Sequence, residues 1–439
     1  MLLPAKSKVL YTFILTVIFF NVAAQNANNT PPVCFSKIND CIITSDGRMK
    51  ITCVDQKHGY GSGSAFDSDI HSPKSVAFSP DGKKVYVNSL EGCKTVVYNT
   101  AGFEKIKSIQ HSFDSGTGEG WLNPSGYYNF THYAGGSAKA FKGKPVEMTF
   151  SKKGDYIFVP YYRRTFDINA QDPSALAVID TDKDEIVLMT ETGPLPKMVT
   201  VSNNGRFLAI THWGDNTVGF MDISNDDYTQ WKHLPPVTIG YKLNLKYSLT
   251  ESVNRDSGSG FSLRGTVFLP GDSILIVGGM GGPTAVIDMT TMKWIGNISG
   301  ITQARHIIVE DGTLYFSRNA SGEVYSLPVA NLLSAIKTPR NSREIKVDGI
   351  RKVAVGGGAR TLKASADGKY LFVACNSASA LYVVDRAKMT VVGKITVDSY
   401  PVGLDVSADG KYVAVTSQGR NGYGGNAVNF YKIEYLKHN

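Results

Sequence analysis

Residues 71–88 of the chain read HSPKSVAFSPDGKKVYVN, and residues 400–416 read YPVGLDVSADGKYVAVT. Both stretches contain a short β-forming run, an Asp-Gly turn and a second β-forming run rich in valine and tyrosine. Asp-Gly between two such runs strongly predicts a β-hairpin, because glycine accepts a positive φ without a Cβ clash. The same hairpin at two distant positions of a 439-residue chain indicates that an internal repeat determines the fold.

Five further copies lie between these two, so that the chain contains seven. Three clear copies and two weaker ones have turns at 151–154, 202–205, 365–368, 269–272 and 309–312. After most hairpins a third strand ends in Asp or Asn, and several units have a fourth strand. Four antiparallel strands in each of seven units predict an all-β fold, a single seven-bladed β-propeller, in which ring closure protects the strand edges.

The two ends of the chain are expected to meet in the last blade. The last unit offers three strands, the third of them at 427–435, and the segment 48–54 precedes the first full unit. This N-terminal strand is expected to complete the last blade as its fourth strand. The propeller domain is therefore predicted to span residues 48–439.

The N-terminus has the pattern of a secretory signal. Lys6 and Lys8 precede an apolar run at 9–20, and small residues follow at 22–24. The prediction is a signal peptide at 1–24 and a flexible, cysteine-containing leader at 25–47, with a signal anchor as the alternative. Cleavage would remove two lysines and lower the formal charge from +8 to +6. The mature protein is expected to be exported, periplasmic or extracellular, without a membrane span.

Export permits disulfides. Four cysteines lie early in the chain, and one or two bridges are expected among Cys34, Cys41, Cys53 and Cys93, with the pairing left open. Cys375 ends an apolar strand and is expected to be a buried thiol. No Cys/His spacing suits zinc, and no covalent haem motif occurs, so neither a metal nor a cofactor is predicted.

The repeat resembles that of the YVTN-repeat β-propeller family, which includes YncE-like exported proteins. The matching elements are the leading prolines of Pro73-Lys74, Pro196-Lys197 and Pro401-Val402, the Ser-Pro-Asp-Gly-type turn, and the strands VYVN at 85–88 and LFVA at 371–374. The resemblance covers about residues 48 to 435 and implies the fold. It implies ligand, nucleic-acid or surface binding, or scaffolding, while some related propellers open sugar lactones and others carry redox cofactors. These motifs build the blade and do not specify an activity.

The candidate binding residues share one face of the predicted ring, opposite the Asp-Gly turns. Eight residues before the turn glycine, or seven in the two weaker units, five blades carry a cation: Lys74, Lys197, Arg264, Arg305 and Arg360. Such a convergence predicts an anion-attracting funnel, with ordinary solvated positions as the alternative. The connections after the second strands add further candidates, namely Arg163, His212, Trp213, Arg318, Asn376 and Arg420.

Two long insertions are expected on the same face. The first, 112–143, carries Trp121, Tyr127, Tyr128, Phe130, His132 and Tyr133, and the second, 242–260, carries Tyr247. Long loops on a rigid scaffold commonly carry binding residues.

Catalytic patterns are sparse. No G-x-S-x-G nucleophile motif or P-loop occurs, and Glu147 with His306 is the one weak acid–base candidate. The leading hypothesis is an exported, non-enzymatic, monomeric propeller that binds an anionic small molecule, polymer or protein partner. The alternatives are a hydrolase acting on an acidic sugar lactone or carboxylate lactone, and a passive protein-interaction scaffold. Nucleic acid is a less favoured partner, because a net charge of +6 is slight for this length.

Overall fold

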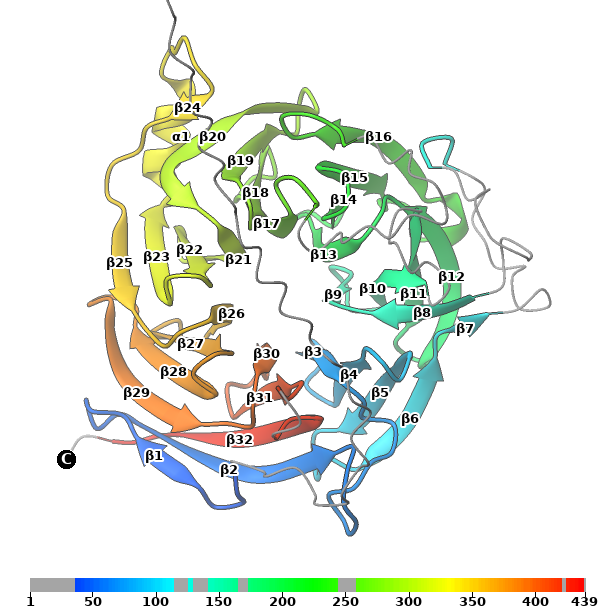
Figure 1. Ribbon diagram of the computed structural model, residues 1–439, viewed down its shortest axis with the longest axis vertical. Helices are drawn as coiled ribbons and strands as arrows, with labels where there is room; N and C mark the ends of the chain where they lie inside the picture. The colour runs from blue at the N-terminus through cyan, green and yellow to red at the C-terminus, as the bar shows by residue number, and fades with distance from the viewer. Residues whose placement is uncertain are drawn as a thin grey trace, which may run out of the picture. The chain divides into compact units, whose positions relative to one another are not determined.

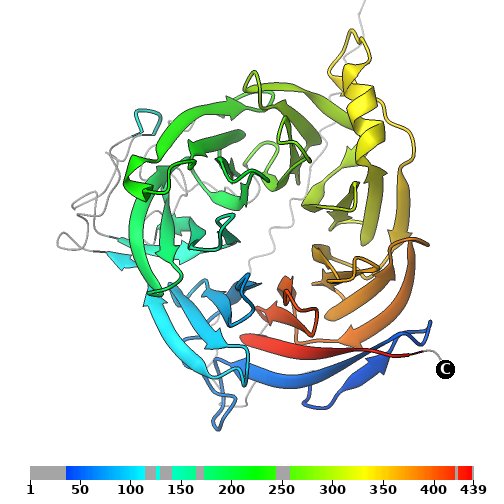
Figure 2. The ribbon, with the colours of Figure 1, turned by 180° about the vertical axis from the view of Figure 1, so that it is seen from behind.

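The computed structural model describes residues 36–113, 125–128, 141–164, 173–243, 258–420 and 424–437. These residues form seven antiparallel sheets that stand as blades around a central channel (Figure 1). The chain passes from blade to blade in sequence order, and Figure 2 shows the same ring from behind. The all-β, seven-bladed propeller expected from the repeat is confirmed.

Each blade begins with an inner strand beside the channel. The inner strands are β3 (Pro73–Phe78), β9 (Thr149–Phe150), β13 (Pro196–Val201), β17 (Leu263–Phe268), β21 (Ala304–Glu310), β26 (Ala359–Ala364) and β30 (Pro401–Val406). The second strands are β4 (Lys84–Ser89), β10 (Tyr156–Arg164), β14 (Phe207–His212), β18 (Ile274–Gly279), β22 (Thr313–Arg318), β27 (Tyr370–Cys375) and β31 (Tyr412–Ser417).

Two more strands complete each blade toward the outside of the ring. The third strands are β5 (Lys94–Asn99), β11 (Ser174–Asp180), β15 (Thr217–Asp222), β19 (Pro283–Asp288), β23 (Glu323–Pro328), β28 (Ala380–Asp385) and β32 (Ala427–Tyr435). The outer strands are β6 (Lys105–Gln110), β12 (Glu185–Thr192), β16 (Lys232–Thr238), β20 (Lys293–Thr302), β25 (Arg351–Ala354), β29 (Thr390–Thr396) and β2 (Met49–His58).

The last blade joins the two ends of the chain. β2 pairs antiparallel with β32, from Met49 opposite Tyr435 to His58 opposite Ala427. The expected closure by an N-terminal strand is therefore confirmed. A further strand, β1 (Cys41–Ile43), pairs with the outer edge of β2, so ordered structure begins before residue 48.

Two blades depart from the simple pattern. In blade two the inner edge is divided between β8 (Phe141–Pro145) and β9, which both pair with β10, and β7 (Ser112–Phe113) pairs with β8. In blade four a parallel strand, β24 (Glu344–Ile345), adds to β20 after the helix α1 (Val329–Lys337). A short 3-10 helix, η2 (Tyr228–Gln230), precedes β16. None of these additions interrupts the ring.

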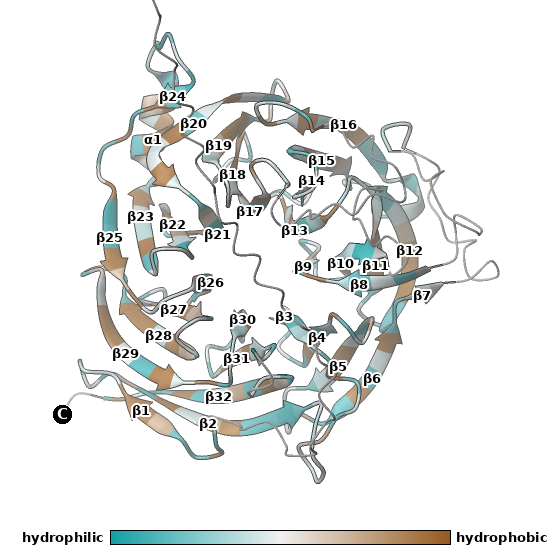
Figure 3. Ribbon diagram, viewed as in Figure 1, coloured by the Kyte–Doolittle hydropathy of each residue, from teal (hydrophilic) through white to brown (hydrophobic). Residues whose placement is uncertain are grey.

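The core lies between neighbouring blades. In Figure 3 hydrophobic residues recur along the strands of all the blades. Between blades one and two, for example, Tyr86 and Val97 pack with Ile157 and Ala177, and all four are fully buried. Because each blade buries apolar surface against both of its neighbours, the packing holds the inner strands in place around the channel.

The cysteine prediction needs a correction. Cys41 and Cys93 are free thiols, so of the one or two bridges expected among the four N-terminal cysteines, a second cannot form. Cys93 lies within blade one and Cys41 on the outermost strand of blade seven, so the fold places the two in different blades. Cys34 lies outside the described residues. Cys375 is a fully buried thiol, as expected.

Candidate functional site

The five predicted cations all lie where the inner strands bulge. In β3 the register with β4 shifts between Pro73 and Ser75, so that Lys74 is the extra residue of a β-bulge. Equivalent shifts occur at the other four cations, namely Lys197, Arg264, Arg305 and Arg360. A bulge leaves one residue out of the ladder and redirects its side chain. The repeated bulge explains how different blades present a cation at the same depth.

Neighbouring blades hold the bulges in place. The backbone carbonyl oxygen of Lys74 accepts a hydrogen bond from Thr416 Oγ1 at 3.2 Å. The carbonyl of Arg264 accepts one from Thr211 Oγ1 at 2.8 Å, and Ser317 Oγ donates to the carbonyl of Arg360. Each donor belongs to the preceding blade. The cation positions are therefore preorganised by contacts between blades.

Four of the cations form one electrostatic cluster, which we call the cation cluster: Lys74, Arg264, Arg305 and Arg360. Burial, and then the charges of Arg360 and Arg264, hold the pKa of Lys74 well below its usual range. Burial followed by the charges of the same two arginines lowers the pKa of Arg305. For Arg360, burial and the charge of Arg264 lower the pKa to about 10. Mutual repulsion in a poorly solvated channel is the shared cause after burial.

Glu147 partly offsets this charge. Its Oε1 lies 2.8 Å from the Arg264 guanidinium, and both side chains are at least nine-tenths buried. Glu147 lies in the gap between β8 and β9, where blade two departs from a continuous inner strand. Asn88 and Ser75 of blade one donate to the adjacent carbonyl of Val146, at 3.4 and 2.6 Å. Blade one therefore supports the segment that presents the carboxylate.

Arg305 and Arg360 have no comparable partner. Among the described residues neither forms an ion pair with a carboxylate, and the Nε of each is buried without a hydrogen-bond partner. Arg360 is 2% exposed, and its side chain forms a hydrogen bond with the hydroxyl of Tyr400. Buried guanidinium groups are normally paired, so the buried Arg360 and the partly buried Arg305 leave donor capacity open in the channel.

Lys197 holds the same bulge position in blade three but has an aromatic environment. Its Nζ lies 3.6 Å from the centre of the Tyr162 ring and 4.8 Å from that of Trp213. Arg163 also stacks on Tyr162, at 4.7 Å, and donates to its hydroxyl. These cation–π contacts join the predicted residues Arg163, Lys197 and Trp213 into a group beside the cation cluster.

The remaining predicted binding residues differ in the contacts that their side chains already make. Both ring nitrogens of His212 are engaged inside blade three, by the Gly193 amide and Thr217 Oγ1, which leaves neither for a ligand. Asn376 is buried and contacts Asn319. Arg318 Nη1 donates to the Tyr325 hydroxyl. Arg420 is exposed and lies over the Tyr400 ring at 6.0 Å.

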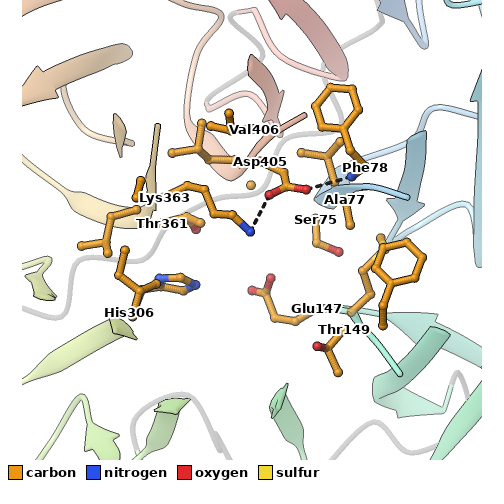
Figure 4. Close-up of a pocket in the computed structure, with 18 of the residues that line it drawn as sticks. Ser75, Ala77, Phe78, Glu147, Thr149, His306, Thr361, Lys363, Asp405 and Val406 are labelled. Carbon is orange, nitrogen blue, oxygen red and sulfur yellow. Dashed lines mark hydrogen bonds and ion pairs between the residues drawn. The ribbon is translucent and has the colours of Figure 1, made fainter. Parts of the chain in front are cut away.

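Below the cation cluster the channel contains a pocket of about 670 Å³ (Figure 4). Its lining starts one residue further along the inner strands, with Ser75, Glu147, Met198, His306 and Thr361. Figure 4 shows the Glu147 carboxylate and the His306 ring facing the centre from opposite sides. The sequence-based pair of Glu147 and His306 therefore shares one pocket.

The pocket contains an ion pair that the sequence analysis missed. Lys363 Nζ lies 2.9 Å from Asp405 Oδ1, and the other oxygen of Asp405 accepts from the Phe78 amide at 2.8 Å. The signal was available, because both residues lie five positions before a turn glycine, Gly368 and Gly410, in adjacent units. Asp405 is also an acid inside the otherwise apolar run 401–406, which indicates a buried carboxylate that needs a partner.

Several predicted loop residues are not part of this geometry. Trp121, Phe130, His132, Tyr133 and Tyr247 lie outside the described residues. Of the first insertion, Tyr128 packs edge-on against His212 and His233, with ring centres 5.6 and 6.0 Å apart.

Within the described ranges no three His, Cys, Asp or Glu residues are grouped to hold a metal ion. No helix in those ranges has the length and apolarity to cross a membrane.

The fold and channel define the class: a seven-bladed β-propeller with cationic bulges at one end of its channel. No family model matches the chain, and a search of curated proteins finds no match. Among solved structures the chain is similar to a chain of hydrazine synthase from Kuenenia stuttgartiensis. The two share 12% sequence identity and a TM-score of 0.54, over 82% of this chain and 96% of that chain. At this identity the likeness shows the fold alone.

Proposed function

We propose that this propeller is a binding protein for an anionic ligand, which is held by the cation cluster at one end of the central channel. The observation that carries the proposal is the pair Arg305 and Arg360. Both guanidinium groups face the cluster, and neither forms an ion pair with a carboxylate of the described chain. A propeller fold is compatible with binding and scaffolding in general. The guanidinium groups of Arg305 and Arg360 narrow this to the binding of an anion.

The energetics favour an anion over a neutral ligand. Four cations and one carboxylate share a poorly solvated space. Burial is the main cause that lowers the pKa of Lys74 and of Arg305, and repulsion by the neighbouring arginines lowers both pKa values further. An anion that binds there would offset this repulsion and supply acceptors for the guanidinium groups of Arg305 and Arg360. A carboxylate or phosphate matches the guanidinium fork with two parallel hydrogen bonds. The aromatic group of Tyr162 and Trp213 would border such a ligand.

The sequence resemblance to YVTN-repeat propellers is consistent with this role. The signal-like N-terminus extends the proposal to an exported protein, in the periplasm or outside the cell. In that setting the ligand would be an anionic small molecule, an acidic polymer or an acidic partner protein.

The test is calorimetry with the mature chain, with inorganic phosphate, citrate and acetate as probes at low and high salt. The double variant Arg305→Gln, Arg360→Gln is expected to weaken binding by about 100-fold or more, since each of the two lost charge-assisted contacts contributes at least about 1.5 kcal/mol. Lys83→Gln, Lys183→Gln is the matched control, because both lysines are largely exposed at the opposite face. Equal affinities in the wild type and the double variant would overturn the proposal.

One observation favours a second candidate, lactone hydrolysis. Glu147 and His306 face the same pocket, where a base could take a proton from water as the water attacks a lactone carbonyl, and could return that proton to the ring oxygen as the acyl C–O bond breaks (Figure 4). Turnover of sugar-acid lactones that is abolished by Glu147→Gln would support this candidate. A lactone panel without turnover would eliminate it and leave the binding proposal untouched.

A further inference from the structure

The pocket below the cation cluster has the size of a small-molecule site, and its lining combines polar and apolar side chains. Its volume of about 670 Å³ lies within the usual range for such sites. Hydroxyl groups line several levels of it, at Ser75, Thr149, Thr200, Thr266 and Thr361. Three of these hydroxyls already donate to backbone carbonyls, those of Val146, Ile276 and Val402. The oxygens of Thr266 and Thr361 therefore keep lone pairs for donors inside the pocket, while the Ser75 oxygen already accepts one hydrogen bond from Asn88 Nδ2 at 3.0 Å.

His306 provides a polar group with open hydrogen-bonding capacity in this pocket. Its Nδ1 is buried and has no hydrogen-bond partner among the described residues. Burial lowers the pKa of the ring to about 4, against the opposing effect of Glu147. The imidazole is thus neutral near pH 7, with one nitrogen as donor and the other as acceptor. A bound molecule with a hydroxyl group would contact the edge of the ring that faces the centre of the pocket (Figure 4).

The pocket and the cation cluster are continuous along the inner strands. Arg305 and His306 are consecutive residues of β21, as Arg360 and Thr361 are of β26. A ligand whose anionic head contacts Arg305 and Arg360 would therefore extend past His306 and Glu147 into the pocket. An alkyl body at that place would leave polar groups of the lining unpaired, and each such group should lower the affinity about tenfold.

We infer that the ligand is a polyhydroxylated acid: a carboxylate or phosphate head bound by Arg305 and Arg360, joined to a hydroxyl-bearing body that contacts His306 and Glu147 in the pocket. This inference rests on the proposed anion-binding function and deepens it, since it assigns a second subsite and a substrate class. The carboxylate and phosphate heads share the same guanidinium chemistry, so both are tested.

The experiment measures the affinity of the mature chain for matched probes by calorimetry. Gluconate is compared with hexanoate and acetate, glucose 6-phosphate with hexyl phosphate and inorganic phosphate, and sorbitol is the uncharged probe. We expect gluconate or glucose 6-phosphate to bind about tenfold or more tightly than its alkyl counterpart, and sorbitol to bind weakest. The pair that shows the larger advantage identifies the head group.

Variants at position 306 assign the subsite. His306→Leu is expected to remove the tenfold advantage of the hydroxylated probe and to leave acetate and phosphate binding unchanged. His306→Asn, which keeps one donor and one acceptor, is expected to retain part of the advantage. Thermal unfolding of each variant checks that it is folded, and His306→Asn serves as the test if His306→Leu is not.

The outcomes separate the two proposals. If the head-only and alkyl probes bind as tightly as the hydroxylated ones, the subsite is wrong while anion binding by the cluster stands. If no anionic probe binds, both the cluster proposal and this inference fail. If the hydroxylated advantage persists in His306→Leu, the body does not contact His306, and the assignment of the subsite is overturned.

Discussion

At the face where the hairpin turns lie, the repeat satisfies its own polar groups, whereas at the opposite end of the channel it leaves charges unpaired. Four turns contain the same hydrogen bond, from a serine Oγ to the side-chain oxygen two residues later, at 2.6–2.7 Å: Ser79 to Asp81, Ser202 to Asn204, Ser365 to Asp367 and Ser407 to Asp409. At the other end the bulges present Lys74, Arg305 and Arg360 without carboxylate partners among the described residues.

The comparison indicates that the two ends serve different purposes. The turns are nearly identical because each must close a hairpin, and local hydrogen bonds are enough to do this. The bulge residues vary from blade to blade, with Val402 in the last blade and cations in five others. Unpaired buried charge weakens a fold, so its concentration at one end points to a binding role there.

Acid is expected to give the largest difference between the two ends. His111 and His212 are fully buried near the cationic end, and burial lowers the pKa of each to about 3. Below their usual pKa of 6.5 the unfolded chain binds protons that the folded chain excludes, so the free energy of unfolding falls as the pH falls from 6.5 toward 3. At pH 5 each histidine should contribute a loss of about 2 kcal/mol, measurable by urea unfolding.

The turn face should respond only in stronger acid. Burial raises the pKa of Asp81, but hydrogen bonds from Ser79 and Lys83 outweigh burial and hold this pKa below 3.8. The stability that the ionised Asp81 contributes is therefore lost only as the pH falls below that value. Hydrogen exchange at pH 5 should therefore rise around His111 and His212 before it rises in residues 79–84. The reverse order would contradict the comparison, and a His111→Gln variant should show a shallower loss between pH 6.5 and 5.

Two arginines offer a matched pair for the next largest effect. At the turn face Arg386 donates to Asp311 at 2.9 Å, to the Tyr315 hydroxyl at 3.1 Å and to the Glu310 carbonyl at 3.0 Å. Arg386→Met should lower the free energy of unfolding by about 2–3 kcal/mol. Arg360→Met should instead raise it by about 1–2 kcal/mol, because it removes an unpaired buried charge, and should weaken anion binding.

Chemical denaturation of both variants in low-salt buffer measures this pair. Equal destabilisation by the two substitutions would mean that Arg360 is as well satisfied as Arg386. The distinction between the two ends of the channel would then be lost.

The smallest effect concerns a single turn. Asp367→Ala removes the acceptor for Ser365 Oγ at 2.7 Å and for the Lys369 amide at 3.1 Å, and should lower the free energy of unfolding by about 1 kcal/mol. Anion affinity should stay within twofold of the wild type, because the turn lies at the far end of β26 from Arg360. A change in affinity as large as that of Arg360→Met would contradict the separation of the two ends.

The sequence by itself determined the number of blades, the closure by an N-terminal strand and the common position of the five cations. These features depend on local signals, Asp-Gly turns and short β-forming runs, that recur at each unit and need no knowledge of distant contacts. The buried state of Cys375 followed from its place at the end of an apolar strand.

Only the tertiary structure decided which of those residues are paired. The contact of Glu147 with Arg264 joins blades two and four, and the ion pair of Lys363 with Asp405 joins blades six and seven, so both pairs depend on how the blades are arranged around the channel. Likewise, both nitrogens of His212 are used inside its own blade, and Cys41 and Cys93 remain free, which no spacing in the sequence could show. The physical reason is ring closure: it brings the seven inner strands around one axis, where each side chain meets partners supplied by other blades.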